Sequence, residues 1–63
     1  MKTFNVSGAS AQLLLGVGAI SAAVGLKDGR FTVHAYPEVA AALERLDPNP
    51  DCAVALLVSE EVS

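Results

Sequence analysis

The sequence predicts a small α/β domain with a three-stranded parallel sheet, connected β-α-β-α-β with the strands in the order 2-1-3 and one helix on each face. Segments in which apolar and polar residues alternate, as in strands, are followed by segments in which apolar residues recur at helical spacing. Clusters of Gly, Pro and Asp separate these segments. The last apolar run, residues 53–58, has no polar alternation at all. Such a strand needs cover on both faces, as strands of parallel sheets have.

The first half of the chain predicts a strand, a loop and a long helix. The strand is expected at residues 2–6, with Phe4 and Val6 on one face. The segment Ser7-Gly8-Ala9-Ser10 follows as a loop, and Ser10 is expected to cap the helix. Apolar residues recur along the helix at helical spacing, and Gly25 and Gly29 bracket its expected end. The recurring apolar residues are Leu13, Val17, Ile20 and Val24.

The second half predicts a turn, a strand, a helix and the final strand. Lys27-Asp28-Gly29-Arg30 has the composition of a turn, and residues 31–36 alternate between two faces as a strand does. Pro37 suits the first position of a second helix, and the prolines of segment 47–51 end it. Its apolar residues lie on one side and are Val39, Ala42, Leu43 and Leu46.

Composition limits the function classes that this chain can belong to. With four Lys and Arg residues in 63 and a net charge of −3, it has no basic surface for nucleic acid or anionic lipid. Cys52 is the sole cysteine, so no internal disulfide can form and a reducing, cytoplasmic location is expected. Hydrophobic residues make up 52% of the chain, which predicts that some apolar surface meets a neighbour.

The uncharged segment 11–26 does not predict membrane insertion. It falls short of the ~20 residues that a spanning helix needs. A secretory signal is the alternative, with Lys2 before the apolar run and Ser21-Ala22-Ala23 as a cleavage region. However, polar residues separate Lys2 from that run, and cleavage would leave a chain too short to fold readily without disulfides.

The end of the sequence predicts an attachment edge. After the strand expected at 53–58, Ser59 can cap a helix and Glu60 and Glu61 suit its first turn. Residues 1–63 are therefore expected to form a single domain that is incomplete, or that a partner completes as a doubly wound domain. A protein partner or a second copy is expected to cover the exposed side of the third strand. The expected interface residues are Leu56, Val58, Glu61 and Val62.

A candidate ligand site lies at the carboxyl ends of the predicted parallel strands. There Ser7, Gly8 and Ser10 would face Ser59 and Glu60 across the crevice where open α/β sheets bind ligands. Backbone N–H groups at the helix start could hold a phosphate, as in a flavodoxin-like or nucleotide-binding module. Glu60 and Glu61 would repel an anion, and no tryptophan or loop tyrosine is available to stack on a flavin ring. A helix-capping turn is therefore the simpler interpretation, and no cofactor is expected.

Other motifs that could carry chemistry have simpler explanations. The glycines in segment 16–21 approximate a dinucleotide fingerprint, but the acidic residue expected about 20 positions later is missing. His34 lacks partners at metal-ligand spacing, and Cys52 has no adjacent His or base to activate it. Glu60 and Glu61 are neighbours that point in different directions on a helix, so they are not an acid/base pair. The sequence therefore predicts no enzyme and no metal site.

One family resemblance covers nearly the whole chain. Segment 51–63, an acidic residue followed by an apolar strand and Ser-Glu-Glu-Val-Ser, is similar to a stretch in the central-stalk subunit called F in the V-type and A-type rotary ATPases. Segments 13–18 and 37–43 resemble the first and second helices of that family. The acidic loop residue, the Gly-Phe pair and the C-terminal part of the family are not matched.

The resemblance implies a non-catalytic stalk-type module of an ion-transport complex. Its partners would be other rotary ATPase subunits, and it would lie in the cytoplasm, peripheral to a membrane complex. Two alternatives stay open: the ligand-binding module at Ser7–Ser10, and a self-assembling structural domain.

Overall fold

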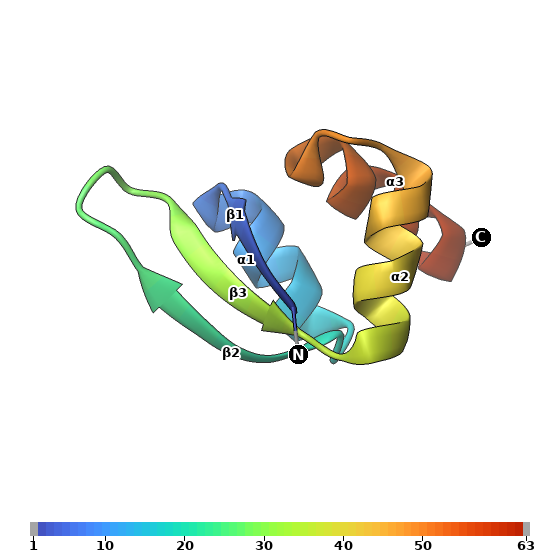
Figure 1. Cartoon of the computed structure of the whole chain (residues 1–63), viewed down its shortest axis with the longest axis horizontal. Coiled ribbons are helices and arrows are strands. Elements are labelled where there is room, and N and C mark those ends of the chain that lie inside the picture. Colours follow the sequence, from blue (N-terminus) through green and yellow to red (C-terminus); the bar gives the residue numbers. More distant parts are fainter. Residues whose placement is uncertain (1, 63) are drawn as a thin grey trace.

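The computed structural model describes the backbone of residues 2–62 and the side chains of residues 2–60. The described elements follow the order β-α-β-β-α-α (Figure 1). They are β1 (Lys2–Val6), α1 (Gly8–Gly16), β2 (Ile20–Gly25), β3 (Phe31–Ala35), α2 (Pro37–Leu46) and α3 (Pro50–Val62).

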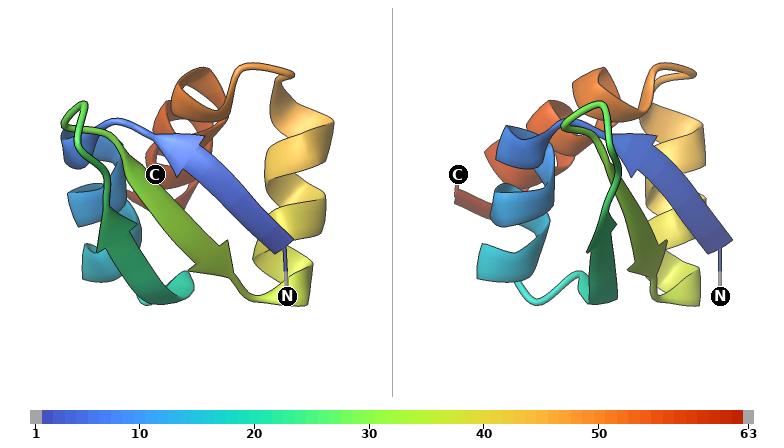
Figure 2. Two further views of the ribbon diagram at one scale, coloured as in Figure 1. Left: turned by 60° about the vertical axis from the view of Figure 1, so that its left-hand side comes forward. Right: turned by 90° about the vertical axis from the view of Figure 1, so that its left-hand side faces the viewer.

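The prediction of a parallel sheet is wrong. β3 lies in the middle of the sheet and pairs antiparallel with both neighbours, in the order β1-β3-β2. The connection from β1 through α1 to β2 leaves room for β3 between them, which is a split β-α-β arrangement. The prediction of one helix on each face also fails, because the helices lie together behind the sheet (Figure 2).

The register of the strands separates an inner from an outer face. Phe4 pairs with Val33, and Ala23 pairs with Val33 from the other side. Val33 and Ala35 are fully buried, and Phe4, Ala23 and Phe31 pack against the core. The outer face carries the alternate residues, which are Thr3, Asn5, Ala22, Val24, Thr32 and His34. Since alternate residues of a strand point to opposite faces, the alternation predicted for residues 31–35 is confirmed.

The final strand predicted at residues 53–58 is a helix. Asn49 begins α3, because its side-chain oxygen accepts the N–H groups of Asp51 and Cys52 at 2.9 and 3.4 Å. Pro50 occupies the first helical position, where its missing N–H costs nothing. Ala53 and Val54 are buried and Leu57 and Val58 half-buried, so one side of α3 packs on the core. Ala55 and Leu56, on the other side of α3, are exposed although they are apolar. The sequence therefore shows an unbroken apolar run where an amphipathic helix would show polar residues.

The predicted long first helix is a short helix followed by a strand. α1 ends at Gly16, and the chain reverses at Gly18, whose φ is +70°. The N–H of Gly18 donates to the Leu15 carbonyl at 3.1 Å, and that of Ala19 to the Leu14 carbonyl at 3.0 Å. This pair of bonds is the Schellman motif. Leu14 and Ala19, the two residues that usually make an apolar contact in this motif, are both buried.

Two glycines two positions apart should respond in opposite directions to alanine. A Cβ at either Gly16 or Gly18 would meet no atom within 4 Å, so only backbone conformation distinguishes them. We expect Gly18→Ala to destabilise by about 1 kcal/mol, because its left-handed conformation disfavours a Cβ. Gly16→Ala should stabilise by up to about 1 kcal/mol, as helix propensity predicts. Urea unfolding followed by circular dichroism measures both; equal effects would contradict the Schellman ending.

The hairpin turn, β1 and α2 are confirmed where the sequence predicts them. The Leu26 N–H donates to the Arg30 carbonyl at 2.7 Å and the Gly29 N–H to the Leu26 carbonyl at 3.2 Å, with Gly29 at φ +83°. This is a tight turn followed by a left-handed glycine, a common link between antiparallel strands. α2 starts at Pro37 and buries Leu43, while Glu44 and Arg45 are exposed.

The core lies between the sheet and the three helices. α3 runs between α1 and α2 and contacts both (Figures 1 and 2). The fully buried large side chains come from each helix and from two strands. They are Val6, Leu14, Val33, Leu43 and Val54.

Candidate functional site

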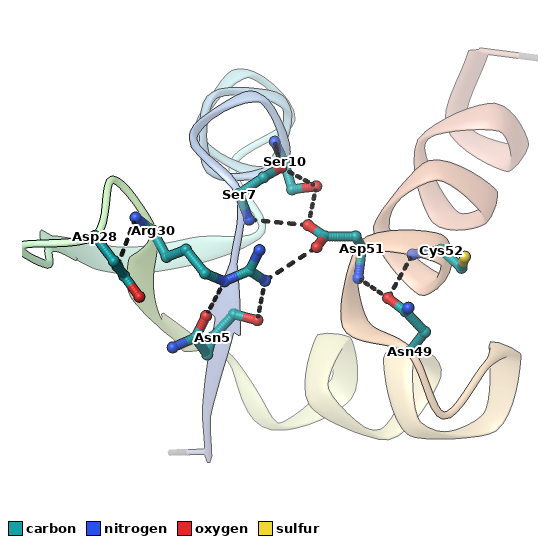
Figure 3. A network of polar contacts seen from close by, with 8 residues as sticks. All are labelled: Asn5, Ser7, Ser10, Asp28, Arg30, Asn49, Asp51 and Cys52. Atoms are coloured by element: carbon teal, nitrogen blue, oxygen red, sulfur yellow. Dashed lines mark hydrogen bonds and ion pairs between the residues drawn. The ribbon is translucent and has the colours of Figure 1, made fainter.

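The main polar cluster joins the start of α3 to the start of α1 and to two strands. We call it the Asp51 junction, and Figure 3 shows its members. They are Asn5 at the end of β1, Ser7 and Ser10 at the start of α1, Arg30 before β3, and Asp51 in the first turn of α3.

The Asp51 carboxylate is the centre of the junction. Its Oδ1 accepts the Ser7 N–H at 2.9 Å and the Ser10 hydroxyl at 2.8 Å. Its Oδ2 accepts Arg30 Nη2 at 3.0 Å. Ser10 is buried, whereas the side chains of Arg30 and Asp51 are 39% and 34% exposed. All three bonds to the Asp51 carboxylate are therefore partly buried, and the Ser10 hydroxyl is the most shielded of the donors.

Arg30 extends the junction to β1. Its Nε donates to the side-chain oxygen of Asn5, and its Nη2 donates to the Asn5 carbonyl at 3.2 Å. The planar guanidinium thus holds a strand end on one side and a helix start on the other. Asp28 accepts the Arg30 N–H at 3.0 Å, so the residue is also fixed by its own turn.

Ser7, and not Ser10 as the sequence predicted, caps α1. The Ser7 hydroxyl oxygen accepts the Ser10 N–H at 3.2 Å, and the two hydroxyl oxygens are also 3.2 Å apart. Because Ser10 lies inside the helix, its hydroxyl is free to reach Asp51. The carboxylate also places a negative charge beside the N-terminal turns of α1 and α3, which the helix dipoles favour.

Hydrogen bonding keeps Asp51 ionised. The Ser7 N–H, followed by the Ser10 hydroxyl and then Arg30, lowers the pKa of Asp51 well below its ordinary value of 3.8, although burial opposes this. A carboxylate with so low a pKa is a weak general base. The junction therefore suits the joining of elements better than proton transfer.

The residues predicted as a ligand site are only partly brought together. Ser7, Gly8 and Ser10 form the start of α1, and a Cβ at Gly8 would lie 3.4 Å from the Phe31 ring. The Ser7 N–H and the Ser10 hydroxyl, which a phosphate would need, donate to Asp51 instead. Ser59 and Glu60 are exposed near the other end of α3, about 12 Å along the helix from Asp51 at 1.5 Å per residue.

The residues predicted as an interface lie on α3. Leu56 is 45% exposed, and Val58 is half-buried. The side chains of Glu61 and Val62 lie outside the described residues. Val58 lines an apolar groove together with α1 and the residue that caps its end, which we call the α1–α3 groove. Its other lining residues are Ala9, Gln12, Leu13, Gly16 and Val17.

The roles of Asp51, Arg30 and Asn5 were not predicted from the sequence. Asn49-Pro50-Asp51 was interpreted as a helix stop, yet a cap residue, Pro and an acidic residue in this order also mark a helix start. That signal could have located α3 and its first-turn carboxylate. The contacts of Asp51 with Arg30 and Asn5 carry no local signal, since they join distant segments.

Among residues 2–60, no three His, Cys, Asp or Glu side chains gather in a way that could hold a metal ion. Cys52 is exposed and His34 half-buried on the outer face of the sheet. In the part of the chain that the structure describes, no helix combines the length and apolar character needed to cross a bilayer.

Fold and junction together define a small α/β domain with a split β-α-β sheet covered on one face by helices. No protein-family model, curated protein or solved structure matches the chain.

Proposed function

We propose that this chain is a non-catalytic protein-interaction module that docks a partner in the α1–α3 groove. The observation that carries the proposal is the contrast between its polar and apolar groups. The clustered polar side chains bond to one another in the Asp51 junction. The apolar side chains Leu13 and Val17 are instead 44% and 39% exposed beside Val58.

The charge pattern indicates the kind of partner that the groove would bind. α1 has no charged residue, and neither has segment 52–59 of α3. An uncharged, apolar groove binds an apolar surface, such as one side of an amphipathic helix, without desolvating a charge. A cytoplasmic location belongs to the proposal, because the exposed sole cysteine suits a reducing compartment.

The proposal does not include a rotary ATPase stalk role. The best-matching segment of that resemblance, residues 51–63, was expected to contain a strand at 53–58, and this segment is helical. The support that remains is the exposed apolar surface.

Site-specific photo-cross-linking in cells tests the proposed function. A photoreactive residue at Val17 should cross-link one defined protein, and the additional change Leu13→Lys should abolish that product by charging the groove. The matched control is the same photoreactive residue at Ala41, an exposed position on α2. Equal products from both positions, or a product that contains only this chain, would contradict docking of a separate partner in the groove.

A further inference from the structure

β2 is an edge strand that pairs with β3 on one side. Because β3 lies on one side of it, half of its backbone N–H and C=O groups point outward. Proteins commonly protect such edges with Lys, Pro, strong irregularity or cover. β2, with the sequence Ile-Ser-Ala-Ala-Val-Gly, has no charged residue and no proline, and its register shift lies at one end, between Ile20 and Ala22. At the opposite edge, Lys2 of β1 pairs with Glu44 of α2 at 2.6 Å.

Exposed apolar side chains border this edge on both sides of the sheet. Val24, on the outer face, is 53% exposed, and Leu26, directly after the strand, is 40% exposed. On the helix side, Leu15 of α1 is 55% exposed and lines a groove with Ala23 and Phe31. An edge that offers backbone hydrogen bonds between two apolar surfaces fits an added strand that is itself apolar.

We propose that a second copy of this chain adds its β2 to this edge, antiparallel and about a two-fold axis perpendicular to the sheet. Two three-stranded sheets would then form one continuous sheet, with the helices of both copies on the same side. Opposite residues of an antiparallel pair point to the same face, so Ala23 lies opposite the partner's Ala23. Ala22 then lies opposite the partner's Val24 on the outer face, and the Leu15 side chains of the two copies approach each other on the inner face.

Lys27, which follows β2, complements the negative end of the α1 dipole, which precedes β2, in this arrangement. α1 has no basic residue in its last turn, so the negative end of its dipole lacks a cation from its own helix. Lys27 follows β2 and is exposed. In the antiparallel pair, Lys27 of one copy lies opposite Ala19 of the second copy. Ala19 follows α1, so the lysine comes close to the end of that helix. The strand itself brings no like charges together.

Sedimentation equilibrium from micromolar to millimolar concentration tests the dimer. Val24→Lys should raise the dissociation constant about tenfold or more, since the two-fold axis introduces the lysine twice at the edge. Thr3→Lys is the matched control, because it places the same charge on the outer face of the other edge strand. This variant should leave the dissociation constant unchanged.

The charge of Lys27 is tested by a second pair of variants. Lys27→Glu should also weaken the dimer, and Arg45→Glu, an equal change of charge on α2, should not.

Nuclear Overhauser effects between labelled and unlabelled copies locate the contact. The expected cross-peaks join Ala22, Ala23 and Val24 of the two copies. A monomer throughout the concentration range would overturn the proposal, as would a dimer that Leu13→Lys disrupts and Val24→Lys does not. The edge and the α1–α3 groove consist of different residues, so failure of this dimer leaves the proposed docking function to its own cross-linking test.

Discussion

Leu14→Ala should remove most of the stability of the domain at 25 °C, whereas Leu15→Ala, at the next residue of the same helix, should change stability little. Leu14 is fully buried between the sheet and the helices, and Leu15 is 55% exposed. Removing a buried leucine side chain costs roughly 2–5 kcal/mol, because it loses apolar burial and leaves a cavity. A single core of this size rarely supplies more than about 3–5 kcal/mol in total. The substitution therefore removes most of the available stability.

Urea unfolding followed by circular dichroism measures both variants against the unmodified chain. Leu14→Val, a smaller truncation, gives a measurable midpoint if Leu14→Ala does not fold. The same experiment distinguishes the observed fold from the predicted long helix, in which Leu13 belonged to the central buried stripe. A Leu13→Ala variant as unstable as Leu14→Ala would contradict the observed packing of α1, where Leu13 is 44% exposed.

Sequence patterns located the elements whose signals are local. Pro37 marks the start of α2, and the Asp28-Gly29 pair marks the hairpin turn, because each depends on the backbone preferences of the residues themselves. The alternation in residues 31–35 likewise follows directly from the two faces of β3.

The helical spacing of residues 13–24 was a coincidence that misled the prediction. Ile20 alone is buried among the four residues of that spacing, which are Leu13, Val17, Ile20 and Val24. The four do not share a helix face, because the chain reverses at Gly18 and both Ile20 and Val24 belong to β2. A glycine in a predicted helix interior carries a helix-propensity cost, and that cost was the available warning.

The final segment misled the prediction for a different reason. An unbroken apolar run fits a buried strand or a helix equally well, and periodicity alone does not decide between them. The position of α3 between α1 and α2 determines which of its residues are buried, and a tertiary contact of this kind leaves no trace in local spacing. The same is true of the Asp51 junction, whose members come from residues 5 to 51.

Asp51→Ala should destabilise the domain by about 1.5–3 kcal/mol, which is the range for hydrogen bonds to a charged group. The change takes the acceptor from the Ser7 N–H and from the buried Ser10 hydroxyl, and it leaves Arg30 with Asn5 alone among its junction partners. Asp51→Asn keeps one acceptor oxygen but no charge, so its loss should be smaller. Glu44→Ala is the control, because its ion pair with Lys2 is exposed and should be worth less than about 1 kcal/mol.

The stability of the unmodified chain should also depend on pH through Asp51. Its pKa in the folded protein is lowered below the ordinary value of 3.8, mainly by the Ser7 N–H and the Ser10 hydroxyl. The unfolded chain therefore binds a proton near pH 3.8, while the folded chain resists protonation to lower pH. The contribution of Asp51 is complete well above pH 3.8 and is lost as the pH falls below it.

Urea midpoints measured between pH 6 and pH 2 should therefore fall more steeply for the unmodified chain than for Asp51→Asn, which has no proton to bind at this position. The gap between the two curves should narrow towards the acid end, because the unfolded chain then binds a proton at Asp51 that the folded chain resists binding. The Ser10→Ala variant should lie between them, since the Ser7 N–H still lowers the pKa of Asp51 when the hydroxyl is gone. Parallel curves for the unmodified chain and Asp51→Asn would show that the carboxylate does not join the helices in solution.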